Sequence, residues 1–162
     1  MDRLWAPWRM EYILAEKTAD AGCIFCIGED HAADREKLVL HRTKHSLVML
    51  NRYPYTNGHL MVAPRQHTAD LDRLADAEML DLFATLRLCR NVLQAAARPD
   101  GFNIGINLGR AAGAGIEEHV HLHIVPRWNG DTNFMAVIPD VRVMPEALQA
   151  SYDRLLPGFP AP

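Results

Sequence analysis

A long hydrophobic run is missing from this sequence of 162 residues. No stretch approaches the roughly 18 to 20 apolar residues that a membrane-spanning helix needs. The first residues, MDRLWAPWRMEYILAEK, also carry charges and two tryptophans where a secretory signal would have an uninterrupted apolar segment. The sequence therefore predicts a cytoplasmic protein with no membrane partner.

An excess of basic residues is missing as well. Lysine and arginine number 17 against 20 aspartates and glutamates, which gives a formal net charge of -3. A protein that binds nucleic acid through its phosphates usually presents many positive charges to them. We therefore expect no nucleic-acid partner, and any phosphate-binding site must be local.

Cysteine is scarce, with three in the chain. Cys89 falls inside an apolar helical pattern, and the other two form the pair Cys23-Ile-Phe-Cys26. This usage favours a reducing compartment and a metal site over a disulfide framework.

Internal repeats and linkers are absent too, so a single domain over residues 1–162 is expected. Within it we distinguish an N-terminal arm (1–22), a core (23–136) and a C-terminal extension (137–162).

What the sequence does contain is the apolar pattern of an α+β domain with a mostly antiparallel sheet. The long helix is expected to take Asp76 as its N-cap and to end at Arg98-Pro-Asp-Gly. Residues 28–37 are expected to form a charged loop. The expected strands cover 38–41, 46–50, 59–64, 102–107 and 120–125, and the expected helices cover 76–96 and 145–156.

Three histidines alternate with apolar residues in His119-Val-His121-Leu-His123. On a strand all three imidazoles point to one face. The first and third Cα atoms of an undistorted strand lie about 13 Å apart, whereas zinc holds every ligand nitrogen at about 2 Å. One ion can therefore take at most two of them, which leaves at least one histidine for nucleophilic or acid–base chemistry.

The segment just upstream, Asn107-Leu-Gly-Arg-Ala-Ala-Gly-Ala-Gly-Ile, is rich in glycine and alanine. Its backbone N–H groups can approach phosphate oxygens closely, and a phosphate beside an imidazole indicates phosphoryl or nucleotidyl transfer. A tight structural connection would use the same residues, so this alternative stays open.

These residues resemble the histidine-triad (HIT) family, whose His-x-His-x-His pattern is HVHLHIVPRW here. The run NRYPYTNGH, from Asn51 to His59, looks like the family's N-x-x-P-x-x-x-G-H signature. WAPWRMEYI, GCIFC and GDTNFM resemble the branch that includes diadenosine tetraphosphate phosphorylases. The resemblance implies a five-stranded antiparallel sheet with one long helix and a short C-terminal helix, a homodimer, and a nucleotide bound against the triad.

The resemblance also implies roles for individual residues. His121 would attack the α-phosphorus and form a covalent nucleotidyl-histidine, while His123 would contact a phosphate or bridging oxygen. His59 would support the triad by hydrogen bonding, and His119 completes the catalytic set. The implied substrate-binding residues are Asn51 for the ribose, Met49 and Met61 for the base, and Asn107, Gly113 and Gly115 for the phosphates. For each methionine, simple core filling remains an alternative.

A zinc site would need two ligands beyond Cys23 and Cys26. In the related galactose-1-phosphate uridylyltransferases a similar pair is completed by two histidines, which map onto His67 and His119, with His45 as the substitute for His67. A reduced, metal-free pair is the alternative. Those transferases carry glutamine where this chain has His123, which argues against sugar-nucleotide transfer.

The expected reaction is therefore cleavage of dinucleoside polyphosphates such as diadenosine tetraphosphate, with inorganic phosphate resolving the intermediate. Water in place of phosphate would make the protein a hydrolase of dinucleoside polyphosphates or nucleoside phosphoramidates. A nucleotide-binding zinc scaffold with little catalysis is a further alternative. The expected cofactor is structural zinc, and Mg²⁺ or Mn²⁺ could arrive with the substrate.

Overall fold

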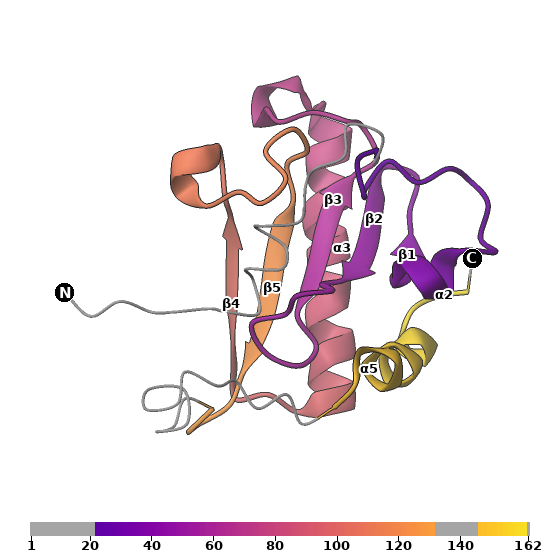
Figure 1. The fold of residues 1–162 in the computed structure, drawn as a ribbon, viewed down its shortest axis with the longest axis vertical. Helices are drawn as coiled ribbons and strands as arrows, with labels where there is room; N and C mark the ends of the chain where they lie inside the picture. The colour runs from indigo at the N-terminus through magenta and orange to yellow at the C-terminus, as the bar shows by residue number, and fades with distance from the viewer. Residues whose placement is uncertain (1–21, 132–145, 162) are drawn as a thin grey trace.

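A computed structural model describes residues 22–131 and 146–161. Its centre is a five-stranded antiparallel sheet in the order β1-β2-β3-β5-β4 (Figure 1). The predicted α+β class and sheet are thereby confirmed. The strands are β1 (Val39–Arg42), β2 (Ser46–Leu50), β3 (Leu60–Pro64), β4 (Gly101–Ile106) and β5 (Leu122–Arg127).

One long helix and several short ones surround the sheet. The predicted long helix is α3 (Asp76–Ala97), and the predicted C-terminal helix is α5 (Leu148–Leu155). The other described helical elements are short. These are α2 (Asp34–Lys37) and the 3-10 turns η1 (Leu71–Arg73), η2 (Arg110–Ala112) and η3 (Leu156–Gly158). The predicted arm, 1–22, and the first part of the C-terminal extension lie outside the described residues, apart from residue 22 itself.

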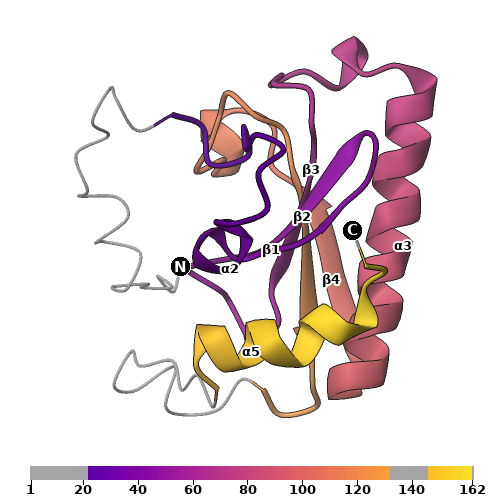
Figure 2. The same cartoon turned by 90° about the vertical axis from the view of Figure 1, so that its right-hand side faces the viewer.

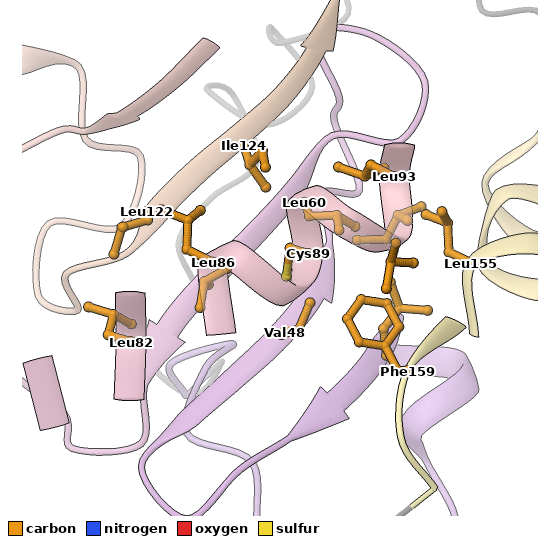
Figure 3. Packing of buried hydrophobic residues seen from close by; sticks show 14 of the residues in the cluster. Val48, Leu60, Leu82, Leu86, Cys89, Leu93, Leu122, Ile124, Leu155 and Phe159 are labelled. Atoms are coloured by element: carbon orange, nitrogen blue, oxygen red, sulfur yellow. The ribbon is translucent and has the colours of Figure 1, made fainter. Parts of the chain in front are cut away.

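The two faces of the sheet have different roles. Alternating strand residues such as Val48, Leu60 and Leu122 point toward α3 and are buried beneath it (Figure 3). The residues between them point the other way, toward the segment that carries Cys23 and Cys26. Figure 2 shows α3 along one face of the sheet and this segment, together with η2, on the opposite side. Among the described residues no long helix covers this second face, which is therefore the one open to a functional site.

The main core forms where α3 and α5 meet the sheet. Leu82, Leu93 and Cys89 of α3 are completely buried, and Leu155 of α5 joins them (Figure 3). Burial of a side chain the size of leucine contributes about 1.5 to 3 kcal/mol to folding. The hydroxyl of Tyr152 also donates to the carbonyl of Val39 at 2.9 Å, which fastens α5 to the edge strand β1. The described part of the C-terminal extension thus belongs to the same core.

Three local predictions were wrong. The stretch expected as a loop up to Lys37 contains α2, a single turn stabilised by ion pairs of Arg35 with Asp153 and of Arg42 with Asp34. It has no buried residue, so no apolar periodicity signals it. The N-cap of α3 is Ala75 and not Asp76; the Glu78 carboxylate accepts from the Ala75 N–H at 2.8 Å.

The last strand is also displaced from its expected range. It begins at Leu122 and continues through Pro126, although residues 120–125 were expected. Beyond Ile124 the strand pairs with β4 alone, so a proline there costs no ladder hydrogen bond to β3.

Within the described residues, none of the helices combines the length and the apolar character needed to cross a bilayer.

Candidate active site and metal centre

The three triad histidines lie where β5 begins, but only His123 is inside the strand. The prediction that all three share a regular strand was wrong. Val120 donates its N–H to the carbonyl of Thr68 at 2.7 Å and so leaves the sheet ladder. His119 and His121 therefore occupy an irregular approach to β5, which lets neighbouring histidines serve different sites.

His121 is held in one tautomer by the backbone carbonyl of His119. Its Nδ1 lies 2.8 Å from the carbonyl oxygen of His119, and because a carbonyl only accepts, Nδ1 carries the proton. The lone pair of the neutral ring is then on Nε2. Burial lowers the pKa of His121, although the hydrogen bond to His119 opposes this effect. The residue is 4% exposed and remains an uncharged imidazole at neutral pH, the form that can act as a nucleophile.

His123 receives its tautomer from His59 through a relay of hydrogen bonds. The Tyr55 N–H donates to Nδ1 of His59 at 3.1 Å, so the His59 proton is on Nε2. That nitrogen lies 2.9 Å from Nδ1 of His123, to which it donates. The neutral His123 ring therefore carries its own proton on Nε2, the state of a hydrogen-bond donor or general acid.

Gly58 allows the chain to deliver His59 to this position. Its φ of +76° lies in the left-handed region, and an added Cβ would meet Leu93 of α3 at 3.1 Å. Only glycine avoids both the backbone strain and the close contact. The glycine before the histidine in the Asn51–His59 signature thus has a physical cause.

Met49, Met61 and His123 form a row across the sheet. Met49 pairs with Met61, Met61 with His123, and His123 with Gly105. Residues directly opposite each other in antiparallel strands point to the same face. Both methionines are buried, while a Cβ on Gly105 would meet no atom within 4 Å. The row therefore runs from packed apolar side chains to open space beside His123.

Asn51 lies beside the same histidine pair. Its Oδ1 accepts from the Tyr53 N–H at 2.9 Å, and its Nδ2 lies 3.3 Å from Nδ1 of His59. The side chain thus stabilises the turn that carries His59. The predicted ribose contact would come in addition to this structural role.

Asn107 and His121 leave the sheet side by side, because the β4–β5 ladder ends at the pair Ile106–Leu122. The glycine-rich loop between them contains η2. Gly113 has a φ of +83° and donates its N–H to Arg110 at 2.9 Å, so this N–H serves the loop itself. Gly115 is half-buried two residues further on.

A second cluster joins the cysteine pair to two histidines. One ligand atom each from Cys23, Cys26, His67 and His119 lies within 4.8 Å of all the others. Nδ1 of His119 is 3.2 Å from Sγ of Cys23 and 3.7 Å from Sγ of Cys26, and Nδ1 of His67 is 3.2 Å from that of His119. A tetrahedral zinc ion with ordinary bond lengths would separate its ligands by about 3.3 to 3.8 Å. The structure brings His67 to this cluster, and not His45.

The protonation states of the cluster also suit a cation. Nε2 of His119 donates to the carbonyl of Pro64 at 2.8 Å, which leaves the lone pair on the inward Nδ1. Burial lowers the pKa of His119, which keeps the ring neutral. Loss of solvent and the neighbouring Cys23 raise the pKa of the Cys26 thiol, a penalty that a bound cation would reverse. The donor set therefore fits zinc.

Sequence reasoning missed two residues of the site. The ring of Phe25 packs 4.8 Å from that of His121, and the ring of Tyr55 stacks 4.9 Å from that of His59. Phe25 lies inside the cysteine pair and Tyr55 inside the Asn51–His59 signature. Their places between recognisable residues are the signal that could have drawn attention to them.

Comparison with known proteins places this geometry in a family. The HIT domain model matches residues 32–130. The chain is 39% identical over 155 residues to a protein of Mycobacterium tuberculosis named AP-4-A phosphorylase, which covers 92% of this chain and 80% of that protein. It is 32% identical over 128 residues to the adenosine 5'-monophosphoramidase hnt1 of Schizosaccharomyces pombe, with 79% and 91% covered.

A solved structure agrees with both matches. The Zn-bound histidine triad family protein from Mycobacterium smegmatis superposes with a TM-score of 0.64 at 29% identity, over 85% of this chain and 92% of that one. The sequence matches extend over most of the domain and the structures share one fold. The chain therefore belongs to the histidine-triad (HIT) family.

Proposed function

We propose that this protein is a nucleotidyl-transferring enzyme that cleaves dinucleoside polyphosphates, such as diadenosine tetraphosphate, by phosphorolysis through a covalent nucleotidyl-His121. The observation that carries the proposal is the hydrogen bond from Nδ1 of His121 to the His119 carbonyl, which leaves a lone pair on Nε2 of a buried, neutral ring. A neutral imidazole nitrogen is the nucleophile that this chemistry needs. The 39% identity to the mycobacterial protein named AP-4-A phosphorylase favours phosphate as the second acceptor.

The reaction has two displacements at one phosphorus. Nε2 of His121 attacks the α-phosphorus of diadenosine tetraphosphate, and the bond to the bridging oxygen breaks, so ATP leaves. An oxygen of inorganic phosphate then attacks the adenylyl-histidine, which breaks the P–N bond, releases ADP and restores the imidazole. Two displacements replace one difficult step with two easier ones.

His123 would assist the leaving group. The relay through His59 keeps the His123 proton on Nε2. From there it can form a hydrogen bond to the bridging oxygen, or be transferred to it, as the P–O bond breaks. Positioned general acids of this kind typically contribute 10²- to 10⁴-fold to a rate. His119 lies behind His121 and takes part through its carbonyl group.

The substrate would lie on the open face of the sheet. Met49 and Met61, at one end of the row that ends in His123, would form the apolar floor beneath a base. Asn51 would contact the ribose, and Asn107 with Gly113 and Gly115 would surround the phosphates beside His121. A divalent ion such as Mg²⁺ or Mn²⁺ would enter on the polyphosphate.

Cys23, Cys26, His67 and His119 would hold a structural zinc ion, whose chemistry is to fix these four side chains in place. Neither sulfur is among the atoms assigned to the reaction.

The proposal is tested by incubating the purified protein with diadenosine tetraphosphate, with and without inorganic phosphate. ADP plus ATP only in the presence of phosphate is the expected result. His121→Ala should abolish turnover, and a brief reaction with labelled substrate should leave a label on wild-type protein that is absent from the variant.

Other products would identify other functions. AMP plus ATP without phosphate would mean a hydrolase, and turnover of adenosine 5'-phosphoramidate alone would match the name of the fission-yeast relative. Tight nucleotide binding with equal inactivity of wild type and His121→Ala would leave a nucleotide-binding zinc scaffold and refute the catalytic proposal.

We also propose a homodimer formed through β4 and α3. β4 is an edge of the sheet as far as the described residues extend, and Ile104 on it is 50% exposed. Leu80 and Phe83 on α3 are 73% and 50% exposed. Light scattering should give twice the chain mass, and a monomeric mass across micromolar concentrations would contradict the proposal.

A further inference from the structure

We propose that Phe25 is a positioning residue that couples the metal centre to the nucleophile, because it links the cysteine turn directly to the ring of His121. The inference rests on the proposed function, in which His121 is the attacking group. It assigns to the cysteine pair a role beyond stability: the pair would control the orientation of His121, which is not among the candidate metal ligands.

The turn between the cysteines directs Phe25 inward. Cys26 donates its N–H to the carbonyl of Cys23 at 3.0 Å, and Ile27 donates to the carbonyl of Phe25 at 2.9 Å. As a result Phe25 is 2% exposed, whereas Ile24, its neighbour in the same turn, is 48% exposed. The position of the Phe25 ring therefore depends on a four-residue turn whose two ends are ligand candidates.

The ring of Phe25 contacts the rings of His119 and His121. Its centroid lies 4.8 Å from that of His121 with an interplanar angle of 38°, and 5.2 Å from that of His119. The ring of His121 also meets His123 edge-on at 4.8 Å. Phe25 and His123 thus restrict the tilt of the His121 ring, while the His119 carbonyl fixes its Nδ1.

Two of these three constraints originate in the metal centre. The carbonyl that accepts from His121 belongs to His119, and the packed ring belongs to the turn between Cys23 and Cys26. A bound cation would replace the contacts of 3.2 Å between thiols and imidazoles with four bonds to one point, and would therefore hold the turn more firmly. A displacement of about 1 Å at a reacting atom can cost roughly 100-fold in rate.

The direct test is Phe25→Leu in the full-length, zinc-loaded protein, with Leu47→Val as the matched control. Leu47 is 3% exposed and belongs to the same apolar cluster as Phe25. The assay measures zinc per chain, kcat and KM for diadenosine tetraphosphate with phosphate, and the ¹⁵N resonances of the His121 ring.

We expect Phe25→Leu to keep its zinc and its KM within about threefold while kcat falls roughly tenfold or more. The His121 resonances should shift or broaden relative to the wild type, because Phe25 no longer restricts the tilt of the ring. Leu47→Val should match the wild type in kcat and in these resonances.

Chelation of zinc supplies the second arm. If Phe25 transmits part of the effect of the metal, chelation should lower kcat in the wild type and should cost Phe25→Leu a smaller factor, because the link through Phe25 is already broken there and only that through His119 remains. Circular dichroism must show that the chelated proteins are folded. If they are not, the zinc-loaded comparison alone decides.

Wild-type kcat and wild-type His121 resonances in Phe25→Leu would overturn the proposal. A rise in KM alone would also overturn it, since Phe25 would then bind substrate and not position His121. If the wild type itself shows no turnover and no adduct, the proposed function fails separately, and the His121 resonances still report whether Phe25 positions the ring.

Discussion

The relay from Tyr55 through His59 to His123 makes a quantitative prediction about a residue that need not touch the substrate. His59 is fully buried, accepts the Tyr55 N–H at 3.1 Å and donates to His123 at 2.9 Å. His59→Phe keeps an aromatic ring of similar size against Tyr55 but removes the hydrogen bonds to Tyr55 and His123, together with the contact of Nδ1 with Asn51. The Nδ1 of His123 then loses its donor, so the ring can carry its proton on either nitrogen.

Two magnitudes follow from this loss. Loss of the hydrogen bonds that His59 makes with Tyr55 and His123 should lower the free energy of unfolding by about 1 to 3 kcal/mol. Residues that orient a functional histidine through its second nitrogen typically affect activity by about 10- to 100-fold. We therefore expect kcat to fall about 10- to 100-fold, which is less than the complete loss expected for His121→Ala.

His59→Gln provides the matched control. Its carboxamide offers both a donor toward His123 and an acceptor toward Tyr55, so it should recover part of the lost kcat. The assay is steady-state kinetics on diadenosine tetraphosphate, with thermal denaturation to confirm folding. A folded His59→Phe protein with kcat within twofold of the wild type would refute the relay.

The remaining predictions concern other parts of the fold. Gly105→Val should keep the wild-type melting temperature, because a Cβ there meets no atom within 4 Å. It should raise KM about tenfold, since the side chain enters the space beside His123. An unchanged KM would show that the substrate lies elsewhere. Burial raises the pKa of the Cys89 thiol to about 12, so this thiol should not react with iodoacetamide at pH 8 in the folded protein. After chelation the reagent should label Cys23 and Cys26 alone, which peptide mass mapping can check. Burial lowers the pKa of His41, so the folded state binds fewer protons than the unfolded chain and the free energy of unfolding decreases as pH falls below about 6.5. In urea titrations, His41→Phe should reduce this decrease at pH 5.5 and leave the free energy of unfolding at pH 7.5 little changed. An equally steep decrease in the variant would contradict the assignment.

Much of the architecture follows from local pattern alone. The short apolar runs of β2 and β3, in which every residue is buried, and the 3.6-residue spacing from Leu82 to Leu93 depend on which side chains must avoid water. Such patterns repeat over several residues and can be read from the sequence. The one-turn helix α2 has no such pattern, because none of its residues is buried. Ion pairs of Arg35 with Asp153 and of Asp34 with Arg42 stabilise it instead.

The histidines themselves illustrate the limit more sharply. The sequence by itself placed three histidines within five residues and so predicted a site around them. That the three could not share one ion holds for a regular strand, which only His123 joins. Tertiary structure decided the tautomer and the neighbours of each histidine. Nδ1 of His119 faces the cysteines because Pro64 accepts from Nε2, and His121 presents Nε2 because its Nδ1 donates to the His119 carbonyl.

The same division holds for the residues around the triad. The sequence determined a cysteine pair that needs two more ligands, but only the fold chose His67 over His45, because the chain after β3 brings His67 to His119 while His45 precedes β2. Phe25 and Tyr55 gained their contacts with His121 and His59 in the same way. A residue type fixes the chemistry that is possible, whereas tautomer, packing and ligand choice depend on atoms that come together only when distant segments fold onto one sheet.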